Sequence, residues 1–456
     1  MSRYSNLLRN AAGIAQVFKA VDITSDDMRL AIIDWFELYY RDAPTKTEDP
    51  CQKIPYTIVR KLTKTVFSEY QAKSDQLYAE SILKELVAIS ETALQLTLIG
   101  GESLLKPILK ADGKGFYFAV VPRNNILVFA RDARGNMTDI GTMEQTAFGN
   151  CYYTLLERRT VDPSGYLTIR YKLMESRSRD SIGKEIPLKA IPQYAALQPE
   201  YTFHSPVGSI GMVRVKTPMV NCVDGSQDGV SVYAAAAGLI RNININEAQF
   251  NDEFELGQSR VMVSDDMLGK DKYGNKAVSD KIFTGLDEGT DELGITIFSP
   301  ALRDQSFLAR KQELFRNIEN VIGLKRGLLS EVEAAERTAT EITSSAGEYN
   351  LTIIDFQKMW ETAVRDALRL CGVLGQLYQV AGANAADDKD VVFNWGNGVL
   401  YDEAKTYAEL KEQVSMGLLQ PERLVGWYHN LPCETPEDRK KIRKNYMPDS
   451  IEEDIE

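Results

Sequence analysis

Few residues of this 456-residue chain have the type and spacing that enzymes use for catalysis. Its two histidines, His204 and His429, are too few for a zinc-protease motif and disfavour a histidine base. Each Gly-Lys pair lacks the following hydroxyl residue of a phosphate-binding loop, and no Gly-x-Ser-x-Gly elbow occurs. The absence of these motifs weakens the enzyme hypothesis but leaves it open, and we expect a non-enzymatic protein with no catalytic residue, no cofactor-binding residue and no metal site.

Acidic pairs are the feature that keeps an enzymatic alternative open. Asp265-Asp266 and Glu452-Glu453-Asp454 offer the carboxylate oxygens that divalent cations prefer. Solvated acidic loops have the same composition and are far commoner. A metal-dependent nucleic-acid enzyme is therefore the weaker interpretation.

Positive charge is clustered at Lys325 and Arg326, in a predicted loop between two long helices. Such a pair can be a solvated turn that complements the C-terminal dipole of the preceding helix. It can also contact a phosphate backbone. The residues alone slightly favour the solvated turn.

Thr338 and Glu341 have the Thr-x-x-Glu spacing of a capping box, in which each side chain bonds a free amide at the helix start. The apolar residues that follow recur in alternating steps of four and three: Ile342, Ala346, Tyr349, Ile353, Phe356, Trp360, Ala363, Ala367 and Leu370. This spacing predicts one long helix, up to Cys371-Gly372, with one continuous buried seam. A seam of this length needs a long partner surface on a neighbouring helix or a neighbouring subunit.

The first half of the chain predicts helices followed by a β-rich insertion. Helical spacing covers Met28 to Tyr40, after the cap candidates Thr24 and Ser25, and again about Asp75 to Leu98. Alternating runs separated by turns at Asp132–Asn136 and Asp162–Gly165 predict hairpins within about 104–216.

The second half predicts two helices around a small module. A flexible turn at 224–229 precedes a helix over Val230–Leu256, and Ser299-Pro300 opens a helix that ends at Gly323. The intervening residues 257–298 are glycine-rich and acidic, which indicates a small β-containing module. The chain ends in helices opened by Pro421 and capped at Thr435, then an acidic tail.

Composition and charge limit the functional classes. The formal net charge is −12, which disfavours tight nucleic-acid binding over the outer surface, although an acidic surface can surround DNA without holding it. No apolar run approaches the ~18 residues of a membrane span, and the first residues have no signal-peptide core. The five scattered cysteines are expected to be reduced and buried.

The order of these elements resembles the portal proteins of tailed double-stranded DNA bacteriophages, the siphophage-type branch in particular. The matching motifs are Leu98–Pro107, Gly323–Ser330 and Arg337–Ile342, with Asp34–Tyr40 and Ile54-Pro55 similar to the family's N-terminal pattern. The family often has lysine where Arg337 stands. The resemblance covers nearly the whole chain.

The resemblance implies an α+β, mainly α portal fold with long stem and wing helices, a β-rich wing insertion and a small α/β clip. The implied parts in chain order are wing 1–229, first stem helix 230–256, clip 257–298, second stem helix 299–322, tunnel loop region 323–337, wing helix 338–400 and crown 401–456. Lys325, Arg326 and Arg337 of the tunnel loop would contact DNA. The clip acids Asp287, Glu288, Asp291 and Glu292 would meet partner proteins, and Thr338 and Glu341 would cap the wing helix.

The resemblance also implies a function and partners. Twelve copies would form a homo-oligomeric ring at one capsid vertex, in the virion, after assembly in the host bacterial cytoplasm. Double-stranded DNA would pass without sequence specificity during packaging and ejection. The ring would dock terminase, a head-completion adaptor, and capsid and scaffolding proteins, with no membrane. Twelve such subunits would carry on the order of −140 charges, which suits a channel that must not hold its DNA. An oligomeric scaffold or adaptor without DNA passage is the other alternative.

Overall fold

The computed structural model describes residues 11–40, 50–258, 260–264, 282–285, 295–298, 301–331, 339–383, 391–396, 403–429, 431, 433 and 435–447. The fold is α+β, as predicted. The chain divides into two compact units. The main unit comprises Met1–Val66 and Ala72–Val392, and the C-terminal unit comprises Phe67–Gln71 and Phe393–Glu456.

Four helices open the main unit: α2 (Ala11–Phe18), α3 (Asp26–Tyr40), α4 (Ile54–Val66) and α5 (Leu77–Gly100). The predicted cap of α3 is confirmed, because the Ser25 hydroxyl accepts a hydrogen bond from the Met28 amide at 3.1 Å. Helix α5 ends where the glycine pair predicted, with Gly101 in the left-handed conformation at φ 84°. The buried face of α5 includes Ile82, Leu86 and Leu94.

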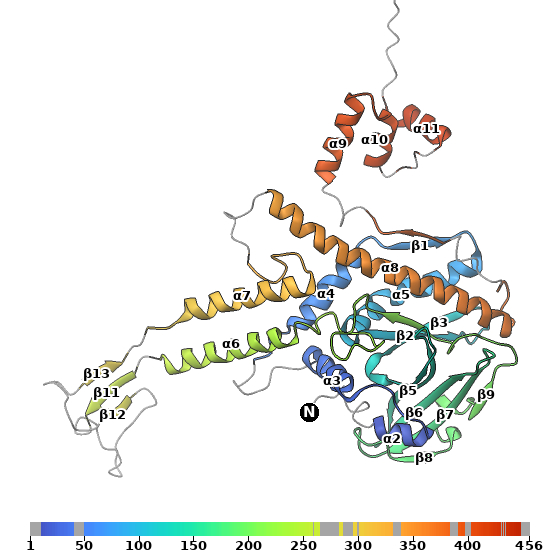
Figure 1. Ribbon diagram of the computed structural model, residues 1–456, viewed down its shortest axis with the longest axis horizontal. Coiled ribbons are helices and arrows are strands. Elements are labelled where there is room, and N and C mark those ends of the chain that lie inside the picture. The colour runs from blue at the N-terminus through green and yellow to red at the C-terminus, as the bar shows by residue number, and fades with distance from the viewer. Residues whose placement is uncertain are drawn as a thin grey trace, which may run out of the picture. The chain divides into compact units, whose positions relative to one another are not determined.

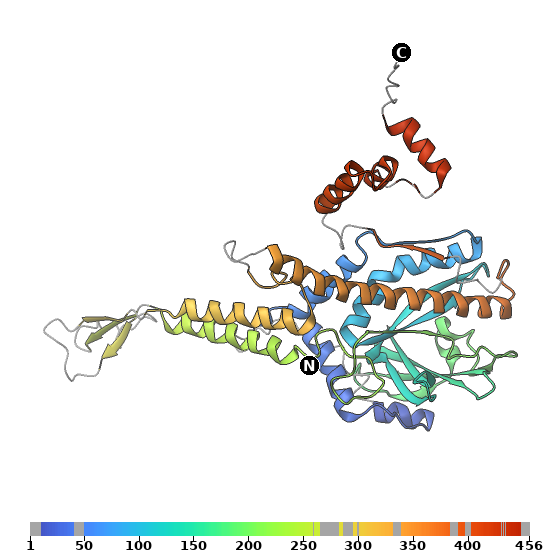
Figure 2. The same cartoon turned by 45° about the horizontal axis from the view of Figure 1, so that its top comes forward.

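Two antiparallel sheets form the predicted β-rich insertion (Figures 1 and 2). One has the order β10-β2-β3, and the other the order β4-β5-β6-β7-β8, with β9 also paired to β7. Their strands are β2 (Glu102–Leu109), β3 (Phe116–Pro122), β4 (Ile126–Arg131), β5 (Met137–Phe148), β6 (Cys151–Val161), β7 (Leu167–Ser176), β8 (Lys184–Ile186), β9 (Glu200–Thr202) and β10 (Val213–Lys216). Short 3-10 turns are η1 (Arg123–Asn125), η2 (Leu188–Ala190) and η3 (Pro192–Tyr194). Both predicted hairpin turns connect neighbouring strands.

Helices α6 (Ala237–Leu256) and α7 (Asp304–Ile322) lie side by side (Figures 1 and 2). The rings of Phe250 and Phe307 stack between them with centroids 5.4 Å apart. The described residues between the two helices form the strands β11 (Arg260–Ser264), β12 (Ile282–Gly285) and β13 (Ile295–Phe298). Strand β11 pairs in parallel with β12 and antiparallel with β13, so the predicted strands in this module are confirmed.

Both of these helices begin later than the sequence predicted. The segment before α6 docks on the end of α5, because the Val232 amide and the Ser231 hydroxyl donate to the Leu98 carbonyl at 2.9 and 3.0 Å. Those bonds hold Val230–Ala236 in turns, and the helix starts only at Ala237. Helix α7 starts at Asp304, because Arg303 is the N-cap residue and pairs with Glu253 at 2.6 Å.

Helix α8 (Ala339–Leu377) has 39 residues and confirms the predicted long helix. The seam is buried from Tyr349 to Leu370, with Trp360 fully buried. Its partner is the same chain, since α8 contacts α4, α5, β2 and β10. Of the two partners that the sequence left open, a neighbouring helix or a neighbouring subunit, the structure shows helices and strands of the same chain against the seam. The helix also continues past Cys371-Gly372, because Gly375 lets α5 approach closely and the Tyr78 hydroxyl donates to the Cys371 carbonyl at 2.7 Å.

The C-terminal unit contains three short helices, α9 (Glu403–Ser415), α10 (Pro421–Tyr428) and α11 (Pro436–Tyr446). Pro421 opens α10, and the Thr435 hydroxyl caps α11 by accepting from the Asp438 amide at 3.2 Å, as predicted. The Phe67–Gln71 segment belongs to this unit because Tyr70 packs on Trp395 with ring centroids 4.4 Å apart. Strands β1 (Gln71–Ser74) and β14 (Val391–Asn394) pair in a two-stranded sheet.

Candidate functional site

The loop that carries Lys325 and Arg326 begins at a well-defined helix end. Gly323 follows α7 in the left-handed conformation, with φ 75°. The Leu324 amide donates to the Glu319 carbonyl at 2.8 Å, and the Gly323 amide donates to the Asn320 carbonyl at 3.3 Å. This pair of bonds is the Schellman motif, which needs a residue without a Cβ penalty at Gly323. The predicted helix end is confirmed.

The side chain of Glu319 organises the rest of the loop. Its carboxylate is fully buried in the last turn of α7 and accepts hydrogen bonds from the chain that returns past it. Oε1 accepts from the amides of Leu329 and Ser330, the latter at 2.9 Å. Oε2 accepts from the Ser330 hydroxyl at 2.7 Å and from the Gly327 amide at 3.3 Å. One carboxylate thus accepts from three backbone amides, of which the Ser330 amide is buried and would otherwise need another partner.

Neighbouring helices hold the same loop from outside. The Lys61 ammonium of α4 donates to the Leu328 carbonyl. The Thr352 hydroxyl of α8 donates to the Gly323 carbonyl at 3.3 Å. The Glu331 amide donates to the Gln312 side chain of α7 at 2.8 Å. Three helices therefore fix the path of this loop.

Lys325 and Arg326 are exposed on a tight turn at the start of this held loop. The Leu328 amide donates to the Lys325 carbonyl at 3.0 Å, and Gly327 has φ 89° at the third position of the turn. Arg326 therefore occupies the second position, at the tip. Cations presented in this way can contact phosphate oxygens without reading bases.

Other predicted site residues lie outside the described residues. Arg337 and Thr338 are not described, and of Glu341 only the helical backbone of α8 is described. The predicted capping box and the third cation of the loop therefore stay predictions. The clip acids Asp287, Glu288, Asp291 and Glu292 also lie outside, as does the acidic pair Asp265-Asp266.

Sequence reasoning missed Glu319, although one signal was present. The last turn of a helix carries partial negative charge, so an acid there is disfavoured unless something compensates it. Glu319 lies in that turn, just before the glycine that ends α7. The compensating amides come from the following loop, which helical spacing does not reveal.

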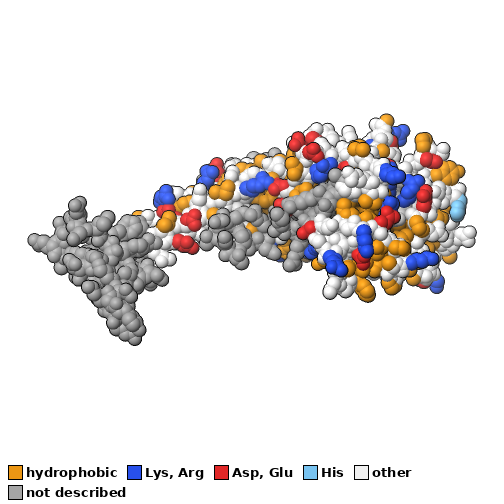
Figure 3. All heavy atoms as spheres, turned by 90° about the horizontal axis from the view of Figure 1, so that it is seen from below, with side chains coloured by type: hydrophobic (Ala, Val, Ile, Leu, Met, Phe, Trp, Pro, Cys, Tyr) orange, Lys and Arg blue, Asp and Glu red, His pale blue; other side chains and the backbone are white. Residues whose placement is uncertain are grey.

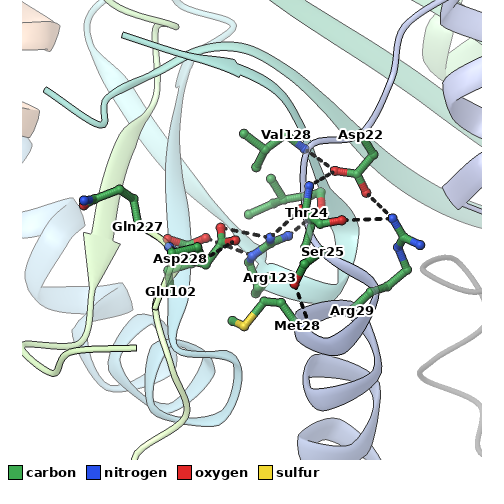
Figure 4. A network of polar contacts seen from close by, with 12 residues as sticks. Asp22, Thr24, Ser25, Met28, Arg29, Glu102, Arg123, Val128, Gln227 and Asp228 are labelled. Atoms are coloured by element: carbon green, nitrogen blue, oxygen red, sulfur yellow. Dashed lines mark hydrogen bonds and ion pairs between the residues drawn. The ribbon is translucent and has the colours of Figure 1, made fainter. Parts of the chain in front are cut away.

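A second polar cluster lies buried where the predicted motif Leu98–Pro107 meets the segment before α6 (Figure 4). The fully buried Arg123 guanidinium pairs with Glu102 at 2.8 Å and with Asp228 at 3.3 Å. Arg131 also pairs with Asp228, at 2.6 Å, and Arg214 donates to Glu102 at 2.7 Å.

This second cluster fixes structure. Arg123 donates to the Thr24 hydroxyl at 3.1 Å and to the Ile126 carbonyl at 2.8 Å, so both terminal nitrogens of its guanidinium bond groups within the chain. Burial opposes the charge of Glu102, but Arg214, Arg123 and Arg131 outweigh it and lower the pKa of that carboxyl. The network ties β2, η1, β4 and β10 to the 224–229 turn, which is therefore hydrogen-bonded and not the predicted flexible turn.

The remaining surface offers few alternatives. In the face shown in Figure 3, Lys and Arg side chains are interspersed with Asp, Glu and hydrophobic ones. Across the described ranges, no three His, Cys, Asp or Glu side chains gather as metal ligands could. No helix within those ranges is long and apolar enough to cross a membrane. The five cysteines form no disulfide with one another, and the expectation that all of them are buried is wrong, because only Cys371 is buried and Cys222 is exposed.

The chain matches no protein-family model and no curated protein. Among solved structures, it is similar to a chain in the neck of the native GTA particle computed with C12 symmetry, with TM-score 0.43 and 11% identity over 93% of this chain and 99% of that one. A chain in the virion of the native gene transfer agent (GTA) particle gives TM-score 0.45 and 10% identity, over 93% of this chain and 99% of that one. A chain in the neck of the empty GTA particle computed with C6 symmetry gives TM-score 0.40 and 10% identity, over 83% of this chain and 90% of that one. At these scores and identities, the likeness carries neither fold nor function over to this chain.

Proposed function

We propose that this chain is the subunit of a portal ring, through which double-stranded DNA enters and leaves a tailed-phage-type capsid. The ring has twelve copies and takes no part in covalent chemistry. Residues 1–229 and 338–400 form its wing, α6 and α7 its stem, 257–298 its clip, 323–337 its tunnel loop region and 401–456 its crown.

One observation carries this proposal: a cationic turn follows directly on a pair of adjacent helices that flank a small sheet. Helices α6 and α7 pack along one another through Phe250 and Phe307. The buried Glu319 then fixes the turn that exposes Lys325 and Arg326. Such a turn can follow a moving phosphate backbone electrostatically, while the net charge of −12 disfavours tight retention of DNA elsewhere.

The clip would meet the partner proteins. Its acids Asp287, Glu288, Asp291 and Glu292 are proposed as contacts for terminase during packaging and for the head-completion adaptor afterwards. Capsid and scaffolding proteins would hold the ring at its vertex in the virion. Each of these contacts is non-covalent and uses no cofactor.

Ring stoichiometry tests the proposal. Purified protein is examined by mass photometry and negative-stain electron microscopy, alone and after co-expression with its capsid and scaffolding proteins. We expect closed rings with a central channel and about twelve subunits, since heterologous contacts close into rings when the rotation allows it. Monomers or dimers under all of these conditions would contradict a portal. Open arrays or rings without a DNA-wide channel would favour a scaffold or adaptor.

A further inference from the structure

The polar cluster around Arg123 contains more cations than acids. Its cations are Arg123, Arg131, Arg214 and Lys216, and the acids that lie among them are Glu102 and Asp228. Within the described residues, no further acid pairs with these four cations. Four cations and two acids leave a surplus of two positive charges. Charge that is partly withdrawn from water is costly unless an opposite charge balances it.

Two of these cations converge on one backbone oxygen at the outer edge of the cluster. Arg214 and Lys216 lie two residues apart on β10, and therefore on the same face of the sheet. Arg214 Nη2 donates to the Gln227 carbonyl at 2.7 Å, and Lys216 Nζ donates to the same oxygen at 3.0 Å. Arg214 also pairs with Glu102, whereas Lys216 forms no ion pair in the described part of the chain. The partial charge of a carbonyl oxygen leaves the ammonium charge unbalanced.

Arg131 brings a third cation to the same edge. Its Nη2 pairs at 2.6 Å with Asp228, the residue after Gln227, and its Nη1 donates to the Gly135 carbonyl at 3.1 Å. Figure 4 shows Gln227 and Asp228 beside Glu102. The three cations repel one another. Burial lowers the pKa of Lys216, and repulsion by Arg214 lowers it more than the attraction of Glu102 raises it. Burial and Arg214 lower the pKa of Arg131 in the same way.

This edge is open to solvent and still has hydrogen-bond donors to offer. Gln227 is exposed, and Arg131, Arg214 and Lys216 are partly exposed. One donor bond of Lys216 goes to Gln227, and an ammonium group has three N–H donors. Arg214 Nη1 donates to no group in the described ranges, since the bonds of this guanidinium come from Nε and Nη2. An anion can therefore reach unused donors next to the surplus charge.

We propose that Arg131, Arg214 and Lys216 form a binding site for a doubly charged phosphate group. A phosphate monoester carries about −1.5 to −2 charge at pH 7 and has three acceptor oxygens, which matches the surplus of two charges and the unused donors. A carboxylate, or a single phosphodiester, has one charge and would balance half of that surplus. The inference does not depend on a portal function, because all of these residues belong to the main unit of one chain.

Isothermal titration calorimetry of the full-length protein with sodium phosphate, against sodium chloride at equal ionic strength, tests the site. We expect saturable binding of phosphate. Lys216→Gln should weaken it about tenfold or more, because a hydrogen bond to a charged group is lost together with half of the surplus charge. Lys216→Arg keeps the charge and the donors and should retain most of the affinity. Circular dichroism and gel filtration confirm that each variant is folded.

Lys172→Gln is the matched control. Lys172 is also a partly exposed lysine on a strand, but Glu185 balances its charge at 3.0 Å, so this variant should bind phosphate like the wild type. Thermal unfolding gives a second readout, because a ligand that binds only the folded chain raises the unfolding midpoint. Phosphate also stabilises proteins by exclusion from their surface, and that effect is common to all variants. Lys216→Gln alone should lose the additional, saturable rise.

The same measurements separate two sources of the phosphate group. Tighter binding of an oligothymidine with a 5′-phosphate than of one with a 5′-hydroxyl would support the site and assign it to the end of a nucleic acid. Equal binding of the two oligonucleotides, together with saturable binding of inorganic phosphate, would support the site and assign it to a small phosphate compound.

Three outcomes would overturn the inference. The first is the absence of saturable phosphate binding by the wild type, which decides the matter even where a variant fails to fold. The second is equal phosphate affinity of Lys216→Gln and Lys172→Gln. The third is a loss of unfolding midpoint by Lys216→Gln that is the same in phosphate and in chloride, which would give Lys216 a structural role only. Ring stoichiometry is measured separately, so none of these results bears on the proposed function.

Discussion

Glu319 shows how a single buried carboxylate can determine the path of a loop. Lys325 and Arg326 are exposed on the turn, and the amides on the far side of that turn bond the two carboxylate oxygens of Glu319. Removing the acceptor would take this partner from the amides of Gly327, Leu329 and Ser330, of which the Ser330 amide is buried. An unsatisfied buried donor costs about 1–3 kcal/mol.

We therefore predict that Glu319→Gln lowers the free energy of unfolding by about 2 kcal/mol, since the amide nitrogen faces donors and cannot accept from them. Hydrogen exchange at the amides of Gly327, Leu329 and Ser330 should accelerate. Urea unfolding and exchange measured by mass spectrometry check both effects. Glu313→Gln is the control, because Glu313 is exposed on the same helix. Unchanged exchange at the three amides would remove Glu319 from its positioning role.

Glu102 predicts a pH dependence of stability. Its pKa in the folded chain is lowered from 4.5, because the guanidinium groups of Arg214, Arg123 and Arg131 outweigh the effect of burial. A group with a lowered folded pKa contributes stability that is fully present above the unfolded value. That stability is lost as the pH falls through the folded pKa.

We expect Glu102→Gln to cost about 3 kcal/mol at neutral pH, because it leaves buried arginine charge without its partner. The difference from the wild type should narrow as the pH falls below 4.5, because the unfolded wild type then takes up a proton at Glu102, and it should be smallest once the pH passes the lower pKa of the folded chain. Denaturation midpoints measured from neutral pH down to acid check this. Glu200→Gln is the control, since Glu200 pairs with Arg170 at the exposed surface. A constant difference across the range would contradict the assignment.

At the scale of elements, hairpins and long helices followed from the sequence because their signals are local. The turns at Asp132–Asn136 and Asp162–Gly165 connect the predicted strands, and Gly323 ends α7 as predicted. The sequence did not predict the first residues of α6 and α7. The Val232 amide donates to the Leu98 carbonyl at the end of α5, and Arg303 forms an ion pair with Glu253 of α6. Helical spacing in the sequence does not reveal such distant partners.

The buried seam of α8 shows the same difference between local signals and distant partners. Its apolar period predicted the buried residues, but period alone cannot say whether the partner is in the same chain or in a second copy. The structure places α4, α5, β2 and β10 against it. The role of Glu319 was hidden for a related reason, since its partners lie in a loop whose return path depends on three helices.

Trp360→Ala should therefore destabilise the chain itself and leave its oligomeric state unchanged. Trp360 is fully buried in the seam, so the cavity should cost about 3–5 kcal/mol. Leu351→Ala is the control, because Leu351 is 63% exposed on the same helix. Urea unfolding and mass photometry measure the two quantities separately. A change of oligomeric state without a loss of subunit stability would return the seam to an interface between subunits.

At the scale of the whole molecule, the charge distribution bears on the proposed passage of DNA. The chain is strongly acidic, with a net charge of −12, and exposes Lys325 and Arg326 on a turn that three helices hold. A few fixed cations surrounded by acidic residues would guide a phosphate backbone through weak ion pairs that form and break readily. Stronger or more numerous cations would increase retention and slow passage of DNA.

The double variant K325A/R326A tests this balance in assembled particles. We expect ring formation to be normal, because the Glu319 bonds that fix the turn go to backbone amides and the Ser330 hydroxyl, and not to these side chains. Packaging or retention of DNA should be impaired, because the phosphate contacts in the proposed channel are lost. Gel analysis of packaged DNA length and infectivity titres measure the effect. K184A/K189A removes two exposed lysines elsewhere and should leave both readouts unchanged. Full-length DNA and normal infectivity with K325A/R326A would show that these two cations do not contact the DNA.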